Sequence, residues 1–209
     1  MRNGKYRELL IGCGHKRDKR IDPRRFGAIR GTDDWADVDK LGPGPKRWHG
    51  VVECLDADPA VKPDFVWNLE NRPWCRRGDI ALEPMNDDTY DEVHAYEVLE
   101  HLGRQGDYRE FFAVFSEIWR VLKPGGFLAA TVPSRFDQWL WGDPGHTRAI
   151  LPCTLIFLCQ PVYADQAGKT SMSDYRSLYR ADFDIINTYD DQRTHQFVLQ
   201  AVKPSRCET

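Results

Sequence analysis

Short hydrophobic runs recur along the chain and are separated by turn-forming residues. The run RELLI at 7–11 leads into two glycines, and GVVECL at 50–55 leads into an acid-rich turn, as buried strands of a parallel sheet do. Similar apolar or alternating runs predict strands at 64–67, 90–95, 127–132, 183–188 and 196–202. The last two of these strands flank a turn at 189–192 and form a terminal pair.

One segment carries a helical repeat instead of a strand repeat. Between 108 and 122 large apolar residues recur at spacings of three and four, which predicts an amphipathic helix that ends at the Lys-Pro-Gly-Gly sequence of 123–126. Residues 96–102 also have helical character. The other segments are a loop-rich insertion at 15–49, a surface connection at 70–88 and an irregular aromatic stretch at 134–181.

The alternation of strands with helices or long connections predicts an α/β domain with a mostly parallel sheet covered on both faces. In such sheets the ligand lies beyond the carboxyl ends of the strands. The residues to inspect for function are therefore those that directly follow each strand. The length of 209 residues suits a single domain with insertions at 15–49 and 134–181.

The composition is that of an ordinary globular protein. Hydrophobic residues make up 41% and charged residues 29%, and the longest apolar run, at 149–159, is interrupted by Pro152 and too short to span a bilayer. The first residues contain no signal-like apolar stretch, so we expect a cytoplasmic protein without membrane contact. The six cysteines form no C-x-x-C pair, which predicts reduced thiols rather than a zinc or redox motif.

The distribution of charge bears on the partners of the protein. The formal net charge of −3 leaves no extended basic track, so a nucleic-acid polymer is not favoured as a partner. Basic residues nevertheless concentrate at 15–25, where the sequence reads HKRDKRIDPRR. This stretch is either a solvated loop or a contact for a phosphate or another anion.

Two features at the predicted strand ends have chemical meaning. Gly12 and Gly14 allow the backbone to turn sharply and approach a ligand. Arg17, however, interrupts the dinucleotide pattern G-x-G-x-x-G, which argues against a nicotinamide-dependent oxidoreductase. Asp56 ends the second strand, where a carboxylate accepts both hydroxyls of an adenosine ribose. From the local sequence it is equally well a turn or helix cap.

The order of the segments resembles that of the class I S-adenosylmethionine-dependent methyltransferases, in particular their type 11 branch. Five segments carry the resemblance: LIGCG at 10–14, LDADP at 55–59, NL at 68–69, YDEV at 90–93 with EVLEHL at 97–102, and WRVLKPGG at 119–126. They are similar to the family's glycine motif, its ribose-binding segment, its adenine-side pair, its fourth strand with the next helix, and its most recognisable stretch. The resemblance covers residues 7 to 133.

The resemblance implies a Rossmann-like sheet of seven strands with an antiparallel last strand and helices on both faces. It also implies that the protein transfers a methyl group from S-adenosylmethionine to an oxygen or nitrogen atom of a small-molecule acceptor. The residues expected to bind the cofactor are Gly12, Cys13, Gly14, Asp56, Ala57, Asn68, Leu69, Ala95 and Glu97.

Three positions depart from the family pattern. Leu10 stands where the family carries an acid, Lys16 where a third glycine is common, and Asn68 where aspartate is more common. Glu8 lies two residues before Leu10 and points to the same face if the strand is regular. The departures keep a second function open, that of a catalytically inert S-adenosylmethionine-binding module with a regulatory or interaction role.

Glu97, Glu100 and His101 are candidates for further chemistry, because spacings of three and four place them together on a helix. This E-x-x-E-H pattern resembles the metal site of small-RNA 2′-O-methyltransferases and of ubiquinone-biosynthesis O-methyltransferases. Those families add a later histidine, which His146 matches, so the resemblance implies a divalent metal such as Mg²⁺ on all four residues. Alternatively, the acid and histidine brace the sheet, as in metal-free relatives. His146, His101 and Glu97 are also the candidates for catalysis by proton transfer.

The stretch 134–181 follows the predicted fifth strand, where we expect the acceptor. Trp139 and Trp141 could stack on a planar acceptor, a class that includes nucleotide-like molecules, while His146 and Arg148 offer polar contacts. The alternative is that the two tryptophans close the core beneath a lid. The apolar run at 150–158 suits a lid helix or a dimer patch, so a homodimer is left open.

Overall fold

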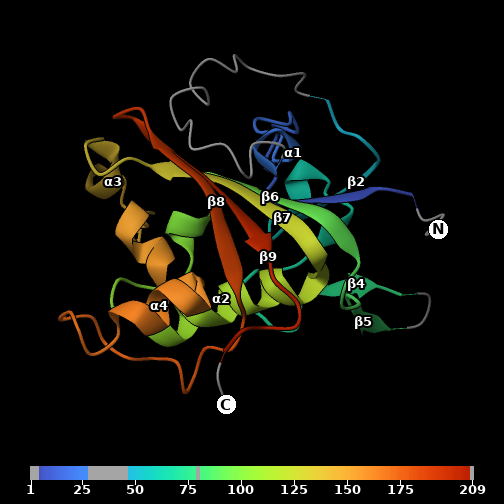
Figure 1. Cartoon of the computed structure of the whole chain (residues 1–209). Helices are drawn as coiled ribbons and strands as arrows, with labels where there is room; N and C mark the ends of the chain where they lie inside the picture. Colours follow the sequence, from blue (N-terminus) through green and yellow to red (C-terminus); the bar gives the residue numbers. More distant parts are fainter. Residues whose placement is uncertain (1–4, 28–46, 79–80, 208–209) are drawn as a thin grey trace.

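The computed structural model describes residues 5–27, 47–78 and 81–207, and its main feature is a seven-stranded sheet (Figure 1). The strands are β1 (Arg7–Ile11), β2 (Val51–Asp56), β3 (Phe65–Val66), β6 (Tyr90–Tyr96), β7 (Leu122–Pro133), β8 (Phe183–Asp190) and β9 (Thr194–Ala201). Their order across the sheet is β3-β2-β1-β6-β7-β9-β8, with parallel pairing from β3 to β7 and β9 antiparallel to both of its neighbours. The predicted Rossmann-like α/β fold with an antiparallel last strand is confirmed.

The central position of β1 sets where the ligand edge of the sheet lies. Ile11 pairs with Leu55 on one side and with Ala95 on the other. All three side chains are fully buried, so the register turns one apolar face of each strand toward the same core. The residues directly after these three consequently meet at one end of the sheet, which we call the carboxyl edge.

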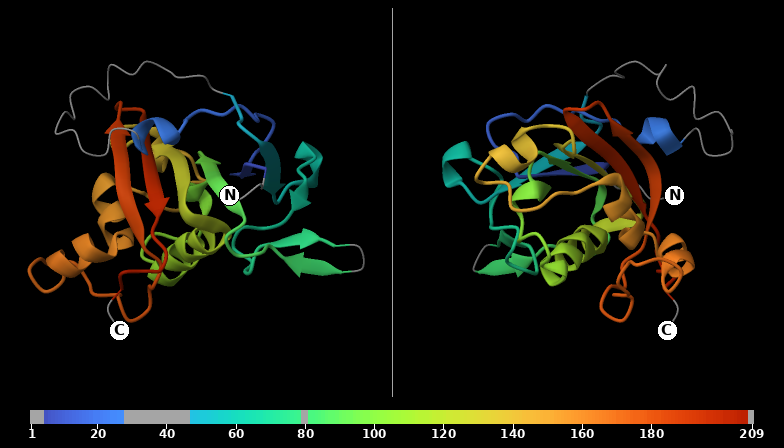
Figure 2. Two further views of the ribbon diagram at one scale, coloured as in Figure 1. Left: turned by 45° about the vertical axis from the view of Figure 1, so that its right-hand side comes forward. Right: turned by 90° about the vertical axis from the view of Figure 1, so that its left-hand side faces the viewer.

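Helices cover the two faces of the sheet unequally (Figure 2). On one face lies α2 (Tyr108–Val121), whose predicted bounds are confirmed to within one residue. Asp107 caps it by accepting a hydrogen bond from the Glu110 N–H at 3.0 Å, and its buried aromatic and branched residues pack on the sheet. The other face carries the chain at 12–26 and the one-turn helix α1 (Arg24–Gly27) over a smaller apolar cluster.

The connection at 70–88 is more ordered than a plain surface connection. It contains a hairpin, β4 (Cys75–Arg77) and β5 (Leu82–Pro84), which projects from the sheet (Figure 2). Trp74 precedes the hairpin and is fully buried. Its indole N–H donates to the Leu69 carbonyl at 3.0 Å and its backbone N–H donates to the Glu117 carboxylate at 2.6 Å. This anchor holds the hairpin against α2.

The segment 96–102, predicted to have helical character, forms only the 3-10 turn η3 (Leu99–His101). Glu97 has a left-handed φ of 54° and Val98 a φ of −138°, so the chain turns sharply before a helix could begin. The expectation that Glu97 and its partners share one face of a helix is therefore wrong, and their proximity must come from tertiary contacts.

The apolar run at 150–158 packs into the core and does not form the lid helix that the sequence suggests. Ile150, Leu155 and Leu158 are buried in the main core together with α2. Most of the run is the 3-10 helix η4 (Pro152–Leu158), which leads into α4 (Gln160–Gln166). The run therefore stabilises the fold and gives no support for a homodimer.

In chain order, the stretch 15–49 lies between β1 and β2, and the stretch 134–181 lies between β7 and β8. Residues 28–46, the larger part of the insertion at 15–49, lie outside the described residues. The insertion at 134–181 contains α3 (Trp139–Gly142), η4 and α4. All six cysteines are free thiols, as predicted. Among the described residues we find no helix with the length and apolarity needed to cross a membrane.

Candidate functional site

The glycine turn after β1 is held at the carboxyl edge by its neighbours. Gly12 and Gly14 have left-handed φ values of 59° and 51°, which glycine adopts without strain. The Gly12 N–H donates to the Leu55 carbonyl at 2.8 Å, and a Cβ added to Gly12 would lie 2.2 Å from Cγ2 of Val98. Glycine is therefore required at position 12 by the close approach of the chain that follows β6.

Asp56 closes the same turn from the end of β2. One of its carboxylate oxygens accepts from the Gly14 N–H at 2.9 Å, and the other accepts from the Asp58 N–H at 2.9 Å. The cap of the 3-10 turn η2 (Pro59–Val61) is supplied by Asp58, which accepts from the Ala60 N–H at 2.8 Å. The sequence allowed Asp56 to be either a ribose-binding acid or a cap. In the structure the cap is Asp58, and Asp56 faces the glycine turn.

The remaining residues predicted to bind the cofactor divide into two groups. Ala57, Asn68 and Glu97 are exposed at the edge, whereas Cys13, Leu69 and Ala95 are buried beneath it. The Asn68 side chain accepts from the Glu70 N–H at 2.9 Å. Burial raises the pKa of the Cys13 thiol to about 12, so this residue is a protonated packing group and not a nucleophile.

A buried ionic cluster lies beneath the segment that follows the glycine turn. Lys19 is 0% exposed, and its Nζ lies 2.5 Å from a carboxylate oxygen of Glu8 and 2.5 Å from one of Glu92. The second oxygen of Glu8 accepts from the His49 backbone N–H at 2.7 Å. Glu8 is on the same face of the strand as Leu10, as expected for a regular strand. Both of its carboxylate oxygens bind groups of the protein, so Glu8 does not replace the acid that the family carries at the position of Leu10.

Strand β6 continues this cluster toward the carboxyl edge. His94 lies between Glu92, whose oxygen is 2.9 Å from Nε2, and Tyr96, whose hydroxyl is 2.7 Å from Nδ1. The Tyr96 hydroxyl also accepts from the backbone N–H groups of Arg20 and Ile21, each at 3.1 Å. Burial lowers the pKa of His94, so the ring is a neutral bridge between acid and phenol. We call Lys19, Glu8, Glu92, His94 and Tyr96 the buried clamp.

Three of the six Lys and Arg residues at 15–25 are bound within the protein. Lys19 belongs to the buried clamp, and Arg17 donates to two carbonyls around the η2 turn at 2.9 and 2.5 Å. Arg24 pairs with Asp22 at 3.3 Å. These three residues fit neither interpretation of the stretch, a solvated loop or an open contact for an anion. Their charges instead hold the chain against β6 and η2.

Three of the four predicted metal ligands converge at the carboxyl edge. The candidate ligand atoms of Glu100, His101 and His146 all lie within 4.8 Å of one another. The Nδ1–H of His101 donates to the Gly145 carbonyl and that of His146 to the Trp139 carbonyl, both at 2.8 Å. These hydrogen bonds set the tautomers and leave a lone pair on each Nε2.

Glu100 is the unusual member of this group. Its side chain is 0% exposed, and both carboxylate oxygens lack a hydrogen-bond partner among the described residues. One of them lies 4.0 Å from Nε2 of His146. Burial, assisted by the charge of the exposed Glu97, raises the pKa of Glu100 to about 8. A buried carboxyl group without a partner costs free energy, which a ligand at this position would recover.

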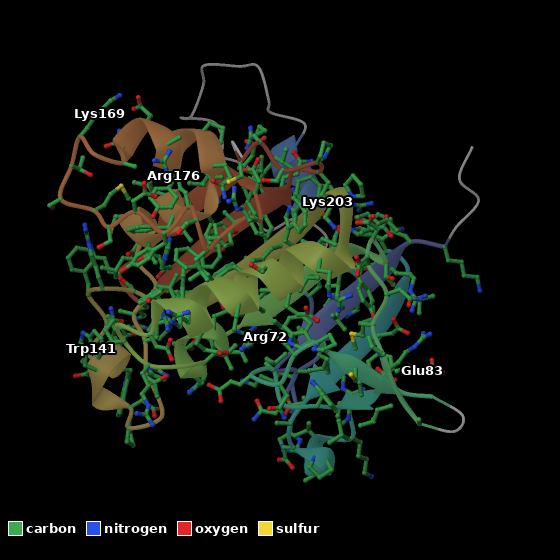
Figure 3. All side chains as sticks on the ribbon, turned by 90° about the horizontal axis from the view of Figure 1, so that it is seen from below. Arg72, Glu83, Trp141, Lys169, Arg176 and Lys203 are labelled. Atoms are coloured by element: carbon green, nitrogen blue, oxygen red, sulfur yellow. The ribbon has the colours of Figure 1, made fainter. Side chains whose placement is uncertain are left out.

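Two exposed tryptophans lie on the short helix whose backbone contacts His146. Trp139 and Trp141, on α3, are 58% and 62% exposed, so the interpretation that they close the core is wrong. Figure 3 shows Trp141 at the periphery of the molecule. Because the Trp139 carbonyl binds His146, α3 is attached directly to the candidate metal ligands.

Arg148 has a structural role instead of the acceptor contact that the sequence suggests. It is only 7% exposed. Its guanidinium donates to the carbonyls of Leu102, Arg104 and Asp107 at 3.2, 2.8 and 2.6 Å. These bonds brace the chain between η3 and α2.

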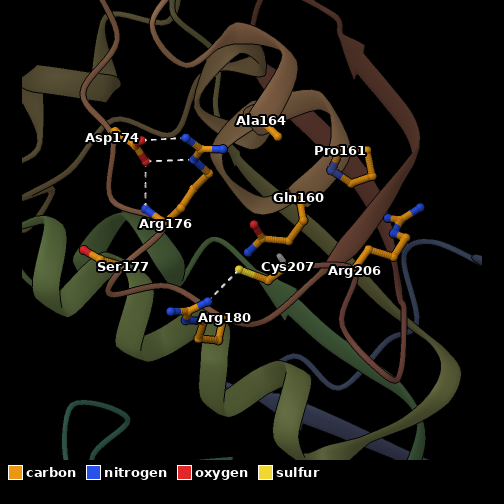
Figure 4. Close-up of a pocket in the computed structure, with 9 residues that line it drawn as sticks. All are labelled: Gln160, Pro161, Ala164, Asp174, Arg176, Ser177, Arg180, Arg206 and Cys207. Atoms are coloured by element: carbon orange, nitrogen blue, oxygen red, sulfur yellow. Dashed lines mark hydrogen bonds and ion pairs between the residues drawn. The ribbon is translucent and has the colours of Figure 1, made fainter. Parts of the chain in front are cut away.

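A separate cavity of about 560 Å³ lies between α4 and the chain at 174–180 and 206–207 (Figure 4). It is at the opposite end of the sheet, because β8 begins and β9 ends there. Its arginines include Arg176, paired with Asp174 at 2.7 Å, and Arg206, paired with Asp182 at 2.6 Å. None of the predicted site residues lines this cavity.

Comparison with known proteins identifies the family. Residues 9–130, more than half of the 209 residues, match the family model Methyltransf_11, described as a methyltransferase domain. The chain therefore belongs to this family of S-adenosylmethionine-dependent methyltransferases. The resemblance inferred from the order of the segments is confirmed, together with the class of enzyme and its cofactor.

The individual proteins similar to this chain match it over a short part or at low sequence identity. A probable S-adenosylmethionine-dependent methyltransferase of Mycolicibacterium smegmatis is 34% identical over 79 residues, which are 36% of this chain but only 28% of that protein. A methyltransferase from Archaeoglobus fulgidus is 13% identical, with a TM-score of 0.47 and coverage of 95% of this chain and 87% of that chain. The N-methyltransferase NodS from Bradyrhizobium japonicum, in complex with S-adenosylhomocysteine, is 14% identical, with a TM-score of 0.48 and coverage of 95% and 79%.

Proposed function

We propose that the chain transfers the methyl group of S-adenosylmethionine to an oxygen or nitrogen atom of a small planar acceptor, a class that includes nucleotide-like molecules. The observation that carries the proposal is that α3 presents two exposed tryptophans, Trp139 and Trp141, and is attached to His146 through the Trp139 carbonyl. Aromatic faces stack on planar molecules, and the neighbouring polar group supplies ligands or bases for the acceptor atom.

Methyl transfer requires alignment more than acid–base chemistry. The sulfonium is already an activated leaving group, so the protein must hold the acceptor atom in line with the methyl group and exclude water. With the ribose at Asp56 and the methionine part along the Gly12 turn, the methyl group would lie toward the end of β6. The acceptor would then enter from the side of α3.

Replacing Asp56 by alanine should weaken S-adenosylhomocysteine binding, because two ribose hydrogen bonds to a carboxylate are lost, each worth about 1.5–3 kcal/mol at most. Isothermal titration calorimetry measures the change. Asp58→Ala is the matched control, since it removes the cap of η2 but no predicted ribose contact. Equal affinity in wild type and a folded Asp56→Ala variant would place the ribose site elsewhere.

We further propose that Glu97, Glu100, His101 and His146 hold a divalent cation. The support is chemical: Glu100 has two buried oxygens without a partner, and each histidine has its Nε2 lone pair available. A ligand set with two imidazoles suits Mn²⁺ or a similar first-row ion better than Mg²⁺, which prefers oxygen ligands. Such a cation would lower the pKa of an acceptor hydroxyl bound to it.

Two alternatives make different predictions. Without a cation, His101 and His146 offer their Nε2 atoms as general bases, since each Nδ1 is bound to a carbonyl, and Glu97 is exposed at the same edge. An inert binding module, which Leu10 and Lys16 favour, would bind S-adenosylmethionine without turning it over. Turnover assays against a panel of metabolites and nucleotides, with and without chelator, distinguish the three cases.

Replacing Trp141 by alanine should lower methyl transfer while leaving S-adenosylhomocysteine affinity within twofold of wild type. Stacking on an aromatic side chain contributes about 1–3 kcal/mol, which corresponds to about 5-fold to 100-fold in rate. We expect the same pattern for His146→Ala. Leu82→Ala, which removes an exposed apolar side chain from the hairpin, is the control. Normal turnover in both site variants would move the acceptor away from α3.

A further inference from the structure

Arg20 is the residue of the basic stretch 15–25 whose position suits a ligand contact. Its side chain is exposed, and in the part of the chain that the structure describes its guanidinium makes no hydrogen bond or ion pair. The guanidinium lies over the ring of Tyr96, 5.2 Å from the ring centroid. A guanidinium stacked on an aromatic face keeps its N–H donors free in its own plane.

The backbone at Arg20 is fixed from both sides. The N–H groups of Arg20 and Ile21 both donate to the Tyr96 hydroxyl, and Lys19 is anchored to two buried carboxylates. Ile21 is itself buried. The buried clamp therefore presents the Arg20 side chain from a rigid support, which reduces the entropy lost when a ligand is bound.

The support places Arg20 at the carboxyl edge. Tyr96 is the last residue of β6 and directly precedes Glu97. The positive charge of Arg20 also reaches Glu100, where it acts against the larger effect of burial on the pKa of that carboxyl. Arg20 thus adds a cation beside the acids and histidines of this edge.

We propose that Arg20 binds an anionic group, a carboxylate or a phosphate, of a ligand held at the carboxyl edge. The proposal rests on the function proposed for this edge. Two ligands could supply the group: the cofactor, through the α-carboxylate of its methionine part, or an acceptor that carries a carboxylate or phosphate. The planar fork of a guanidinium matches either anion with two parallel hydrogen bonds.

The first arm of the test compares S-adenosylhomocysteine with 5′-methylthioadenosine, which lacks the carboxylate and the amino group. If the cofactor supplies the anion, Arg20→Gln should weaken S-adenosylhomocysteine binding by about 10-fold to 100-fold, as expected for a charged hydrogen bond, and leave 5′-methylthioadenosine unchanged. Arg20→Lys should retain part of the affinity. Arg109→Gln is the matched control, because Arg109 is exposed and stacked in the same way on Tyr108, at 5.4 Å.

The second arm titrates pyrophosphate into protein saturated with S-adenosylhomocysteine. If the acceptor supplies the anion, wild type binds pyrophosphate, Arg20→Gln loses that binding, and Arg109→Gln keeps it. Should Arg20→Gln match wild type in both arms, the assignment of Arg20 is overturned while the cofactor site stands. A folded wild type that binds neither S-adenosylhomocysteine nor pyrophosphate overturns the transfer site and the assignment together.

Discussion

Replacing Lys19 by methionine should destabilise the folded chain by about 3–5 kcal/mol, because the buried Glu8 carboxylate would lose its counter-charge and Glu92 would keep only Arg24, at 3.7 Å. Glu8 and Glu92 are both 0% exposed, and each lies 2.5 Å from the Lys19 ammonium. Methionine keeps much of the length and apolar volume of lysine, so little of the loss would come from packing. Urea denaturation followed by tryptophan fluorescence measures the free energy of unfolding.

Two further variants separate the buried charge from a general effect of removing a lysine. Lys169→Met breaks a pair with Asp165 whose side chains are 66% and 63% exposed, so we expect no measurable change in the free energy of unfolding. The double variant Lys19→Met with Glu92→Gln should recover part of the lost stability, because the buried negative charge of Glu92 is then also removed. If Lys19→Met is as stable as Lys169→Met, the ion pairs of Lys19 with Glu8 and Glu92 do not stabilise the fold.

The elements that the sequence predicts best are those whose pattern is local. The strand at 7–11 has the predicted bounds, and the helix α2 ends one residue before its predicted end. Their apolar repeats are complete within one element, and residues with strong conformational preferences mark the ends. The strand β7 begins five residues earlier than predicted, because Leu122 already pairs with Tyr90 before the Pro-Gly-Gly sequence.

The features that the sequence does not predict depend on contacts between distant segments. Trp74 is anchored by Glu117, 43 residues away, and Lys19 by Glu92, 73 residues away. No local pattern distinguishes a buried lysine from the exposed ones that surround it. One signal of the buried clamp was nevertheless present, because Glu92, His94 and Tyr96 alternate with the apolar Val93 and Ala95 along β6.

The candidate site was predictable where topology alone brings residues together. The Gly12 turn and Asp56 meet because parallel strands end at one edge. Glu100 and His146 meet for a different reason: the backbone N–H groups of Thr147 and Arg148 donate to the Glu100 carbonyl at 2.9 and 3.1 Å. The spacing of Glu97, Glu100 and His101 predicted a shared helix face, but the chain forms the 3-10 turn η3 there, and only Glu100 and His101 come together with His146.

Exhaustive chelation should lower methyl transfer by on the order of 100-fold or more, as expected when a metal that positions the substrate is lost. Activity should return with Mn²⁺ more fully than with Mg²⁺, because two of the four proposed ligands are imidazoles. Elemental analysis of the purified protein and calorimetric titration of the chelated protein with Mn²⁺ give readouts that do not depend on the acceptor. S-adenosylhomocysteine affinity should change little, since the ribose contact expected at Asp56 and the turn at 12–14 do not involve the cation.

Glu100→Gln tests the same proposal within the protein. The amide keeps the size of the side chain but removes the charge, so Mn²⁺ binding and methyl transfer should both fall by at least about 10-fold. In the absence of metal the variant should be no less stable than wild type, because the carboxyl that it replaces is buried and its oxygens have no partner among the described residues. Glu83→Gln, on the exposed hairpin, is the control. Unchanged activity after chelation, with no metal in the elemental analysis, would contradict the cation and leave His101 and His146 as the bases of a metal-free transfer.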